Sequence, residues 1–290
     1  MKGIIAALSA SAIFAIAFLS GCGTGAGAPG AVNPGAGAAA PGDSDTLAKI
    51  KREGVLRWGA DPSGGAPFAF FDPKDPDKVI GFEVDIMDKL ASHLGVKPEL
   101  VRAQWDSLLD NLRVKRSDIV INGVEITDER KTRVSFSKPY YVYEQQLTVR
   151  AEDKDKFKSL DDLKGKKIGT LSGAESNHVL TRAGFDDALI NKYDDSSTPY
   201  KDLELKRVDA VVQESIIAAH YAGQTASLFN IPQTFSPGKY GVAVRLEDSP
   251  LLIEIDRVLD LMKKNGELAD IYKKWNMWNE RQKDVGVNEK

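Results

Sequence analysis

The chain has 290 residues, of which 42% are hydrophobic and 28% are charged. These proportions are close to the averages of soluble globular proteins, so they exclude the disordered, collagen-like and multi-span membrane classes. The length suits one large domain or two of ordinary size. Lys and Arg number 39 against 42 Asp and Glu, a net charge of −3 without a long block of either sign. This balance argues against nucleic acid as a partner, because such proteins normally carry a basic face.

The amino terminus has the features of an export signal. Lys2 precedes a run from Ile4 to Leu19 that only Ser9 and Ser11 interrupt. This run is short for a membrane-spanning helix, which needs about 20 apolar residues, so we expect a signal peptide over residues 1–21. The tetrad that ends at Cys22 reads Leu-Ser-Gly-Cys and resembles the bacterial lipobox. The resemblance implies lipidation of Cys22 and anchoring at a membrane surface through acyl chains.

Gly, Ala and Pro make up nearly all of residues 23–42. A segment of this composition cannot bury an apolar face, so residues 22–43 are expected to be a flexible tether. Its Gly-x-Gly patterns follow no strand and open no helix, which argues against a nucleotide site. Cys22 is the single cysteine, so no disulfide within the chain is expected.

Strand and helix patterns alternate after the tether. Apolar residues recur every four positions from Phe82 to Leu94, the spacing of one helix face, and Gly95 ends the run. The order strand, helix, strand, helix, strand predicts a parallel sheet covered by helices. The expected elements of this first unit are strands at 55–59, 100–101 and 119–121 and helices at 81–94 and 105–114.

A second α/β unit begins near residue 167. Gly266 separates the last two expected helices, as a residue that ends a helix should. The expected elements are strands at 167–170, 209–212 and 240–244 and helices at 174–183, 200–206, 215–222, 251–264 and 267–275. The chain is therefore predicted to belong to the α/β class.

Several segments together carry a family resemblance from about residue 47 to about residue 280. In this order and spacing they resemble the polar amino-acid-binding family of solute-binding proteins that serve ABC importers. The segments are Gly54–Arg57, Gly81–Ile86, Trp105–Leu109, Ile126–Arg130, Phe136–Tyr141, Leu163–Gly169, Arg207–Ala210, Tyr240–Arg245 and Ile271–Trp275.

The resemblance implies a two-lobed periplasmic binding protein of type II, with the ligand in the cleft between two α/β lobes. Residues 44–143 and 239–290 would form lobe 1 and residues 144–238 lobe 2, with hinges near 143–145 and 236–238. The implied partners are a free amino acid and the membrane subunits of an importer. We expect an exported, lipid-anchored monomer that is not an enzyme.

A free amino acid brings a carboxylate and an ammonium, and burying either of them unpaired costs several kcal/mol. The resemblance places Arg130 where the family grips the ligand carboxylate in a bidentate manner. In the second unit, Gly173, Ala174 and Glu175 lie between a strand and a helix, so that their backbone N–H groups would face the same carboxylate. The family usually has Gly-Thr-Thr here. The Glu175 side chain is expected either at the ligand or in solvent at the helix start.

Two further residues correspond to family positions in the cleft. Glu214 stands where the family commonly has an Asp that binds the ligand ammonium, although an exposed glutamate at a helix start is the alternative. Trp105 stands at the wall of the cleft, and a core tryptophan that opens a helix is the alternative.

The chain departs from the family in two places. An aromatic lid usually follows the position of Asp61, but this chain has glycines there, so either the pocket is wider or an aromatic residue of the next segment fills the gap. The candidates for filling the gap are Phe70 and Phe71, and Phe68 is expected among the residues that contact the ligand. Many relatives also have Ser-Ser-x-Ser where this chain has Asn122, Gly123, Val124 and Glu125. This departure places a glutamate at the ligand.

Asp61, Glu125 and Glu214 would then share one cleft with Arg130, the one clear cation. A positive ligand side chain would balance these charges, which suggests arginine, lysine or ornithine. Glutamine stays an alternative, because Glu125 can turn away and Asn122 can pair with an amide. An enzyme on the same scaffold, as some cyclohexadienyl dehydratases are, is a further alternative with Glu125 or Glu175 as general acid.

No metal site and no cofactor are expected. The three histidines, His93, His178 and His220, lack metal-ligand spacing to one another. Asp72, Asp75 and Asp77 lack the ligand order of an EF-hand, so a connecting loop is expected there.

Overall fold

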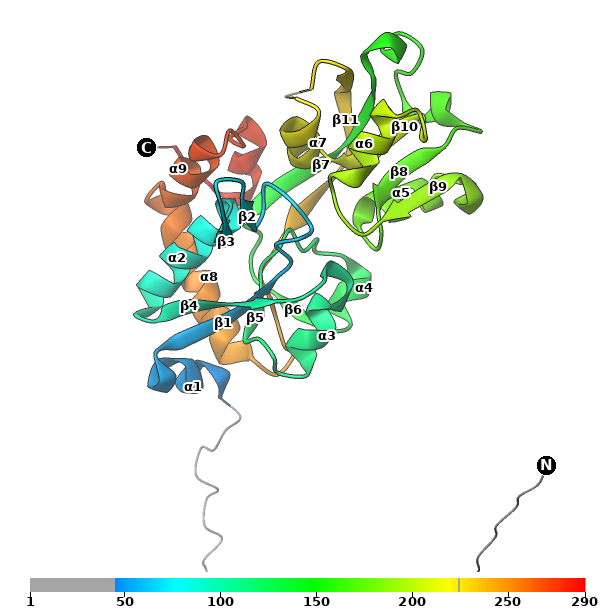
Figure 1. The fold of residues 1–290 in the computed structure, drawn as a ribbon. Helices are drawn as coiled ribbons and strands as arrows, with labels where there is room; N and C mark the ends of the chain where they lie inside the picture. Colours follow the sequence, from blue (N-terminus) through cyan, green and yellow to red (C-terminus); the bar gives the residue numbers. More distant parts are fainter. Residues whose placement is uncertain (1–44, 224, 290) are drawn as a thin grey trace, which may run out of the picture. The chain divides into compact units, whose positions relative to one another are not determined.

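The computed structural model describes residues 45–223 and 225–289, which belong to one compact unit (Figure 1). The expected export signal, Cys22 and tether lie outside the described residues. Among the helices that the structure describes, none has the length and apolar character needed to cross a membrane.

The first lobe is built on a five-stranded sheet with the order β4-β1-β5-β12-β6. β1 pairs in parallel with β4 and β5, while β12 runs antiparallel to β5 and β6. Its strands are β1 (Val55–Ala60), β4 (Lys97–Arg102), β5 (Ile119–Val120), β6 (Ser135–Phe136) and β12 (Ala243–Val244). The parallel pairing predicted for the first three strands is confirmed.

Helices cover both faces of this sheet. Ile119 and Ile121 belong to the hydrophobic cluster that includes α2, α8 and α9, whereas Val120 belongs to the cluster beneath α3. This alternation follows from the two-residue period of a strand. The helices are α1 (Thr46–Glu53), α2 (Phe82–Leu94), η1 (Trp105–Ser107), α3 (Leu108–Arg113), α4 (Asp128–Lys131), α8 (Ser249–Lys264), α9 (Glu267–Lys274) and η5 (Glu280–Val285).

The second lobe is built on another five-stranded sheet, with the order β11-β7-β10-β8-β9. Val211 packs with the cluster that includes α6 and α7, and its neighbours Ala210 and Val212 face the opposite cluster with α5. The strands are β7 (Tyr141–Arg150), β8 (Ile168–Leu171), β9 (Ile190–Tyr193), β10 (Ala210–Glu214) and β11 (Leu228–Tyr240). The helices are η2 (Ala151–Asp153), η3 (Leu160–Leu163), α5 (Glu175–Arg182), η4 (Asp187–Leu189), α6 (Thr198–Glu204) and α7 (Ser215–Tyr221).

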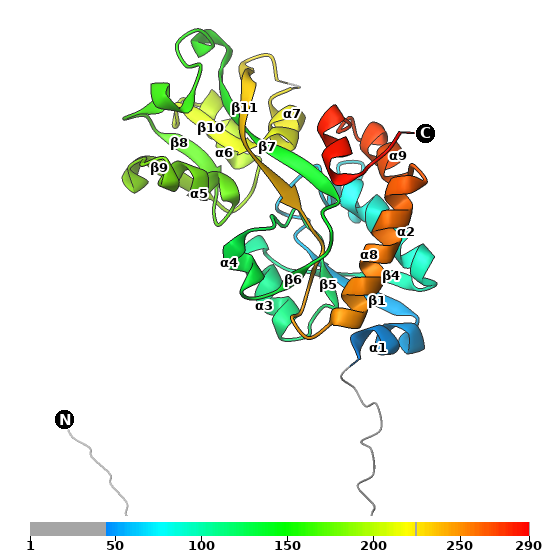
Figure 2. The same cartoon turned by 180° about the vertical axis from the view of Figure 1, so that it is seen from behind.

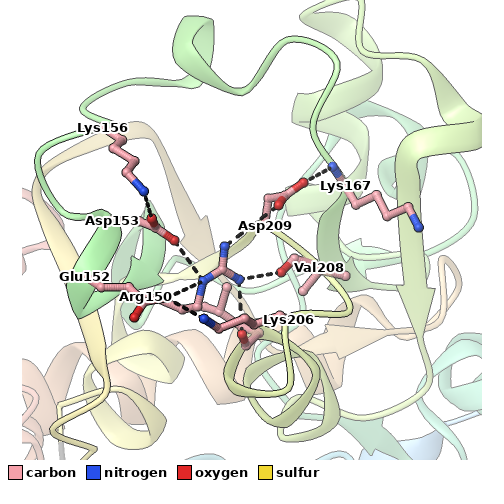
Figure 3. Close-up of polar contacts among 9 residues, drawn as sticks. Arg150, Glu152, Asp153, Lys156, Lys167, Lys206, Val208 and Asp209 are labelled. Carbon is pink, nitrogen blue, oxygen red and sulfur yellow. Dashed lines mark hydrogen bonds and ion pairs between the residues drawn. The ribbon is translucent and has the colours of Figure 1, made fainter.

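Arg150 is the last residue of β7 in this second sheet and lies in a cluster of polar contacts (Figure 3). Its Nε donates to Asp153 at 2.8 Å and its Nη1 to the backbone oxygen of Val208 at 2.8 Å. Asp209 beside it accepts from the backbone N–H of Lys167 at 2.9 Å. These contacts fix the loops around the guanidinium, and the cluster therefore has a structural role.

β7 and β11 are the two long antiparallel strands that lead from one lobe to the other (Figure 2). Tyr141 of β7 pairs with Tyr240 of β11 near the first lobe, and Arg150 pairs with Leu228 at the other end. The register of β11 shifts between Phe235 and Gly238. The predicted hinges and lobe boundaries fall within these two strands, and they stay predictions.

Three expectations differ from the structure. The expected strand at 240–244 is divided, because Tyr240 ends β11 on one sheet and β12 joins the other. The helix expected from Trp105 begins as the 3₁₀ turn η1 and becomes α-helical at Leu108. The aspartates expected in a loop belong to the hairpin of β2 (Phe70–Asp72) and β3 (Asp75–Ile80). Short turns and hairpins give too little periodicity to be predicted reliably.

Glu83 is a buried acid that connects α2 with the rest of the first lobe. It lies in the first turn of α2, where it accepts from the backbone N–H of Gly123 at 2.7 Å and from the Tyr140 hydroxyl. Burial raises the pKa of Glu83 to about 7, against an ordinary value of 4.5. The folded protein therefore binds this proton more tightly than the unfolded chain does, so it loses stability as the pH rises toward and through 7.

Glu83→Gln keeps the acceptor and removes the ionisable group. We compare the free energy of unfolding of this variant with that of the wild type. The difference should shift in favour of the variant by about 2 kcal/mol from about pH 5 to pH 8, since only the wild type must ionise a buried carboxyl. Denaturant unfolding at both pH values measures the difference. Glu247→Gln, a change at an exposed glutamate of the same lobe, is the control. A constant difference between Glu83→Gln and the wild type would contradict the expectation.

Candidate functional site

The loops that follow the strands of both sheets meet at one cavity, which we call the inner cavity. In α/β sheets, ligands bind outside the carboxyl ends of the strands, and these loops lie at such ends. The space between atoms at this cavity, including space open to solvent, is about 410 Å³. Its lining is Asp61, Gly64, Gly65, Phe68, Trp105, Asn122, Gly123, Glu125, Leu171, Ala174, Ser196, Glu214 and Ile217.

The two lobes touch around this cavity. The backbone N–H of Ser196 donates to the oxygen of Gly64 at 3.0 Å, and the N–H of Ala66 donates to the Tyr221 hydroxyl at 3.1 Å. These contacts join the loop after β1 to the second lobe. The cavity is thus bounded by both lobes.

Asp61 follows β1 and holds the surrounding loops by its carboxylate. Its Oδ1 accepts from the backbone N–H groups of Ser63 at 2.9 Å and Gly64 at 3.2 Å, and its Oδ2 accepts from the N–H of Trp105 at 2.8 Å. Its own N–H donates to the Asn122 side-chain oxygen at 2.7 Å. Asp61 lines the cavity, but its carboxylate already accepts hydrogen bonds from three backbone N–H groups. The Asn122 oxygen is likewise occupied, which weakens its suitability for a ligand amide.

The loop after β5 passes closely beneath Phe68. Gly123 has φ of +63°, and a Cβ built on it would lie 2.5 Å from the Phe68 ring. Two residues on, Glu125 pairs with Tyr240 at the end of β11 and is 1% exposed. A glycine is needed at 123 because only its backbone permits both the left-handed conformation and the contact with the ring.

Arg130 and Glu125 form an ion pair at the boundary between the lobes, in which Glu125 is buried and Arg130 is partly buried. Arg130 lies on α4, whose N-cap Thr127 accepts from the Arg130 N–H at 3.2 Å. Its Nη1 donates to the Glu125 carboxylate, and its Nη2 donates to the backbone oxygen of Gly173 at 3.1 Å. The N–H of Glu175, at the start of α5, donates to the other Glu125 oxygen at 3.0 Å. Burial opposes the charge on Arg130, but the Glu125 carboxylate raises the pKa of the guanidinium above its ordinary value.

Trp105 forms a wall against this pair. The guanidinium carbon of Arg130 lies 5.5 Å from the Trp105 ring, within the range of a cation–π contact. Trp105 borders the inner cavity and also the neighbouring outer cavity, which Arg130, Gly173 and Glu175 line. The side chain of Glu175 pairs with Arg182 and is 16% exposed, so it does not extend freely into solvent.

Glu214 ends β10 inside the second lobe and is 3% exposed. Burial, the nearby charge of Glu125 and a hydrogen bond with Glu125 raise the pKa of Glu214 to about 8. Its Oε2 atom has no hydrogen-bond partner among the described residues. Glu214 is therefore a buried acid that lacks a cation of its own in this part of the chain.

The structure brings the eleven residues predicted for the ligand to the two adjacent cavities. Their role as ligand contacts stays a prediction. The suggestion that Phe70 or Phe71 fills the lid position is wrong for the inner cavity, which Phe68 lines instead. Phe70 packs against His220 and Trp275, and Phe71 lies under Arg102, because the hairpin turns both rings away.

Five residues of the inner cavity were not expected from the sequence. Ser196 follows β9, a strand that was not expected, and Ile217 lies on α7, where its apolar character indicated only a core position. Gly64 and Gly65 were noticed only as departures from an aromatic lid. The complete set of missed residues is Gly64, Gly65, Leu171, Ser196 and Ile217. Recognition of β9 as a strand would have pointed to Ser196.

The two α/β lobes and the cavity that they share define the class of periplasmic binding proteins, which hold a small solute between two lobes. Within this class, residues 56–277 match the bacterial extracellular solute-binding proteins, family 3, and the chain belongs to this family. It is an amino-acid-binding protein of the kind that works with ABC transporters and is exported.

Comparisons with individual proteins give similar results. The chain is 36% identical to the L-cystine-binding protein TcyJ of Escherichia coli (strain K12) over 234 residues, which cover 80% of this chain and 86% of TcyJ. A solved structure of an ancestral arginine-binding protein bound to arginine has a TM-score of 0.70 and 38% identity, over 77% of this chain and 98% of that one. The ancestral amino acid-binding protein AncCDT-1, a precursor of cyclohexadienyl dehydratase, has a TM-score of 0.73 and 33% identity, over 80% and 99% of the chains.

Gly123 is constrained both by its positive φ and by the Phe68 ring beside it. We expect Gly123→Ala to destabilise the protein more than Gly95→Ala, since both residues have positive φ but only Gly123 lies against a ring. The strain of alanine at positive φ costs about 1 kcal/mol, and the clash with Phe68 adds roughly 1–3 kcal/mol. Thermal unfolding of both variants measures the losses. Equal losses would mean that the Phe68 contact can relax without cost.

Proposed function

We propose that the protein binds a basic amino acid, of the arginine, lysine or ornithine type, and delivers it to the membrane subunits of an ABC importer. The proposal is carried by one observation: the inner cavity holds two buried glutamates, and only one of them is paired with a cation among the described residues. A ligand with two positive groups and one negative group suits this arrangement.

Each charged group of such a ligand would have a partner of opposite charge at the cavity. The ligand carboxylate would pair with Arg130 and with the N–H of Glu175, because these are donors that already converge on a carboxylate. The ligand α-ammonium would pair with Glu214 and favour its ionised form, because a nearby cation lowers the pKa of a carboxyl group. A side-chain cation would pair with Glu125. No charge in the cavity would then stay buried without a partner, which is the condition for burying charges at low cost.

The walls of the cavity suit the methylene stem of such a ligand. Phe68 and Trp105 from the first lobe and Leu171 and Ile217 from the second supply apolar surface between the charged groups. Long basic side chains bury their stems along apolar surface while the charged head meets a polar partner.

The lipid anchor and the tether expected at the amino terminus are consistent with delivery of the ligand to an importer. Lipidation at Cys22 would anchor the protein at the membrane, and the Gly/Ala/Pro tether would let the folded part reach the membrane subunits. We propose a monomeric binding protein with no catalytic role. Ligand that touches both lobes would stabilise the form in which they meet, with β7 and β11 as hinges.

Two alternatives have specific support. The ancestral arginine-binding protein has also been solved bound to glutamine, at 38% identity and a TM-score of 0.70. AncCDT-1 is described as a precursor of an enzyme, and Glu214 has the raised pKa that a general acid needs. A fold alone does not decide among these functions.

Arg130→Ala tests the carboxylate contact. We expect the affinity for the amino acid ligand to fall roughly 30-fold or more, because truncating a buried charged partner usually costs 2 kcal/mol or more of binding. Calorimetric titration measures the change, and circular dichroism checks that the variant is folded. Arg113→Ala is the matched control, since Arg113 is exposed, pairs with Asp110 and lines neither cavity. Unchanged affinity in Arg130→Ala would remove Arg130 from the site.

A panel of ligands tests the ligand class. We expect residues 45–289 to bind arginine, lysine or ornithine more tightly than histidine, glutamine, glutamate or cystine, because only the first three carry a full net positive charge at neutral pH. Titration calorimetry ranks them. Binding of glutamine or cystine at least as tight as that of arginine would contradict a basic ligand. Turnover of arogenate or prephenate above background would replace the transport function with an enzyme.

A further inference from the structure

The Glu125 carboxylate occupies a binding position for an anion. It accepts from the Arg130 guanidinium through one oxygen and from the N–H of Glu175 through the other, at 3.0 Å in the second case. The first donor belongs to the first lobe, and the second is the N-terminal amide of α5 in the second lobe. A carboxylate that bridges a guanidinium and a helix N-terminus is held as a bound anion would be.

This carboxylate also separates Arg130 from the inner cavity. Glu125 lines the inner cavity, whereas Arg130 lines only the outer cavity. Three donor contacts of the guanidinium are already made, because Nη1 also donates to the Glu125 backbone oxygen at 3.2 Å and Nη2 donates to Gly173. Trp105 covers the guanidinium at 5.5 Å. A solute carboxylate in the inner cavity would therefore meet Glu125 before it met Arg130.

Two like charges cannot share this position at low cost. The groups that face Glu125 are Arg130 from α4, Glu214 from β10, and Glu175 at the start of α5, with Tyr143 of β7 close to the same charges. Arg130 is the one cation in this set, so it can neutralise either Glu125 or a ligand carboxylate. Whichever carboxylate leaves Arg130 needs another partner, since an unpaired buried charge is strongly unfavourable.

We propose that Glu125 is a resident competitor for the ligand carboxylate, and that its displacement selects ligands with a second positive group. This inference rests on the proposed function. An amino acid displaces the Glu125 carboxylate from Arg130 when it binds. A basic ligand supplies a side-chain cation to the displaced carboxylate, whereas a neutral ligand leaves it buried beside Glu214 without a cation. Glu125 is thus a specificity-determining residue that acts mainly by penalising neutral amino acids.

Glu125→Gln tests the competition by calorimetric titration with arginine and with glutamine. The variant keeps the size of the side chain and removes the charge that must be displaced. We expect glutamine to bind at least tenfold more tightly than it binds the wild type, and the preference for arginine over glutamine to fall at least tenfold. Glu247→Gln is the control for net charge, because Glu247 is exposed and lines neither cavity. It should change the preference less than threefold.

The change in glutamine affinity in Glu125→Gln distinguishes two roles of Glu125, competition with the ligand carboxylate and mere attraction of the ligand cation. If Glu125 only attracted the ligand cation, Glu125→Gln would weaken arginine binding and leave glutamine unchanged. Unchanged or weaker glutamine binding in Glu125→Gln therefore overturns the inference while leaving the proposed function in place.

A second measurement needs no ligand. Denaturant unfolding of Glu125→Gln, Arg130→Gln and the double variant gives the coupling between the two side chains in the free protein. We expect the effects on the folded-to-unfolded ratio to depart from additivity by at least tenfold. Additivity within twofold would overturn the inference, since the free protein would then lack the resident pair. Coupling without binding of any amino acid would overturn the proposed function and the competition for ligand together, and would leave only a structural ion pair.

Discussion

The contact on which the site depends is the ion pair of the partly buried Arg130 with the buried Glu125, which also accepts from the N–H of Glu175. It joins α4 of the first lobe to the start of α5 in the second. A pair buried in this way gives little net stability, but removal of one partner leaves a charge that the interior cannot accommodate. The pair therefore constrains both the contact between the lobes and the charge that a solute must bring.

Two of the departures from the family pattern, at Glu125 and at Glu175, meet in one feature of the fold. Glu125 replaces a small polar residue in the first lobe, and Glu175 replaces a threonine in the second. In the folded protein the backbone of the second residue donates to the side chain of the first at 3.0 Å. The Glu175 side chain turns away to Arg182, so its backbone N–H stays available at the start of α5. Changes that look independent along the chain thus meet at the same anion position.

The three acidic residues of the cavity have different surroundings, which stabilise their negative charge to different degrees. Asp61 accepts from three backbone N–H groups, so it organises loops more than it attracts a cation. Glu125 is neutralised by Arg130. Glu214 lies in the interior without a cation, and burial raises its pKa to about 8. Three carboxylates in one cavity therefore present much less negative charge to a solute than their number suggests.

The sequence by itself determined the α/β class, the parallel strands and most helices, because runs such as Phe82–Leu94 carry their periodicity locally. Its family resemblance also implied several residues that line the two cavities, although Gly64, Gly65, Leu171, Ser196 and Ile217 were not expected. The tertiary structure alone decided that Glu125 pairs with Arg130, that Asp61 is held by backbone N–H groups and that Phe68 lines the cavity instead of Phe70. These outcomes depend on contacts between loops that are far apart in the chain, and no local pattern specifies them.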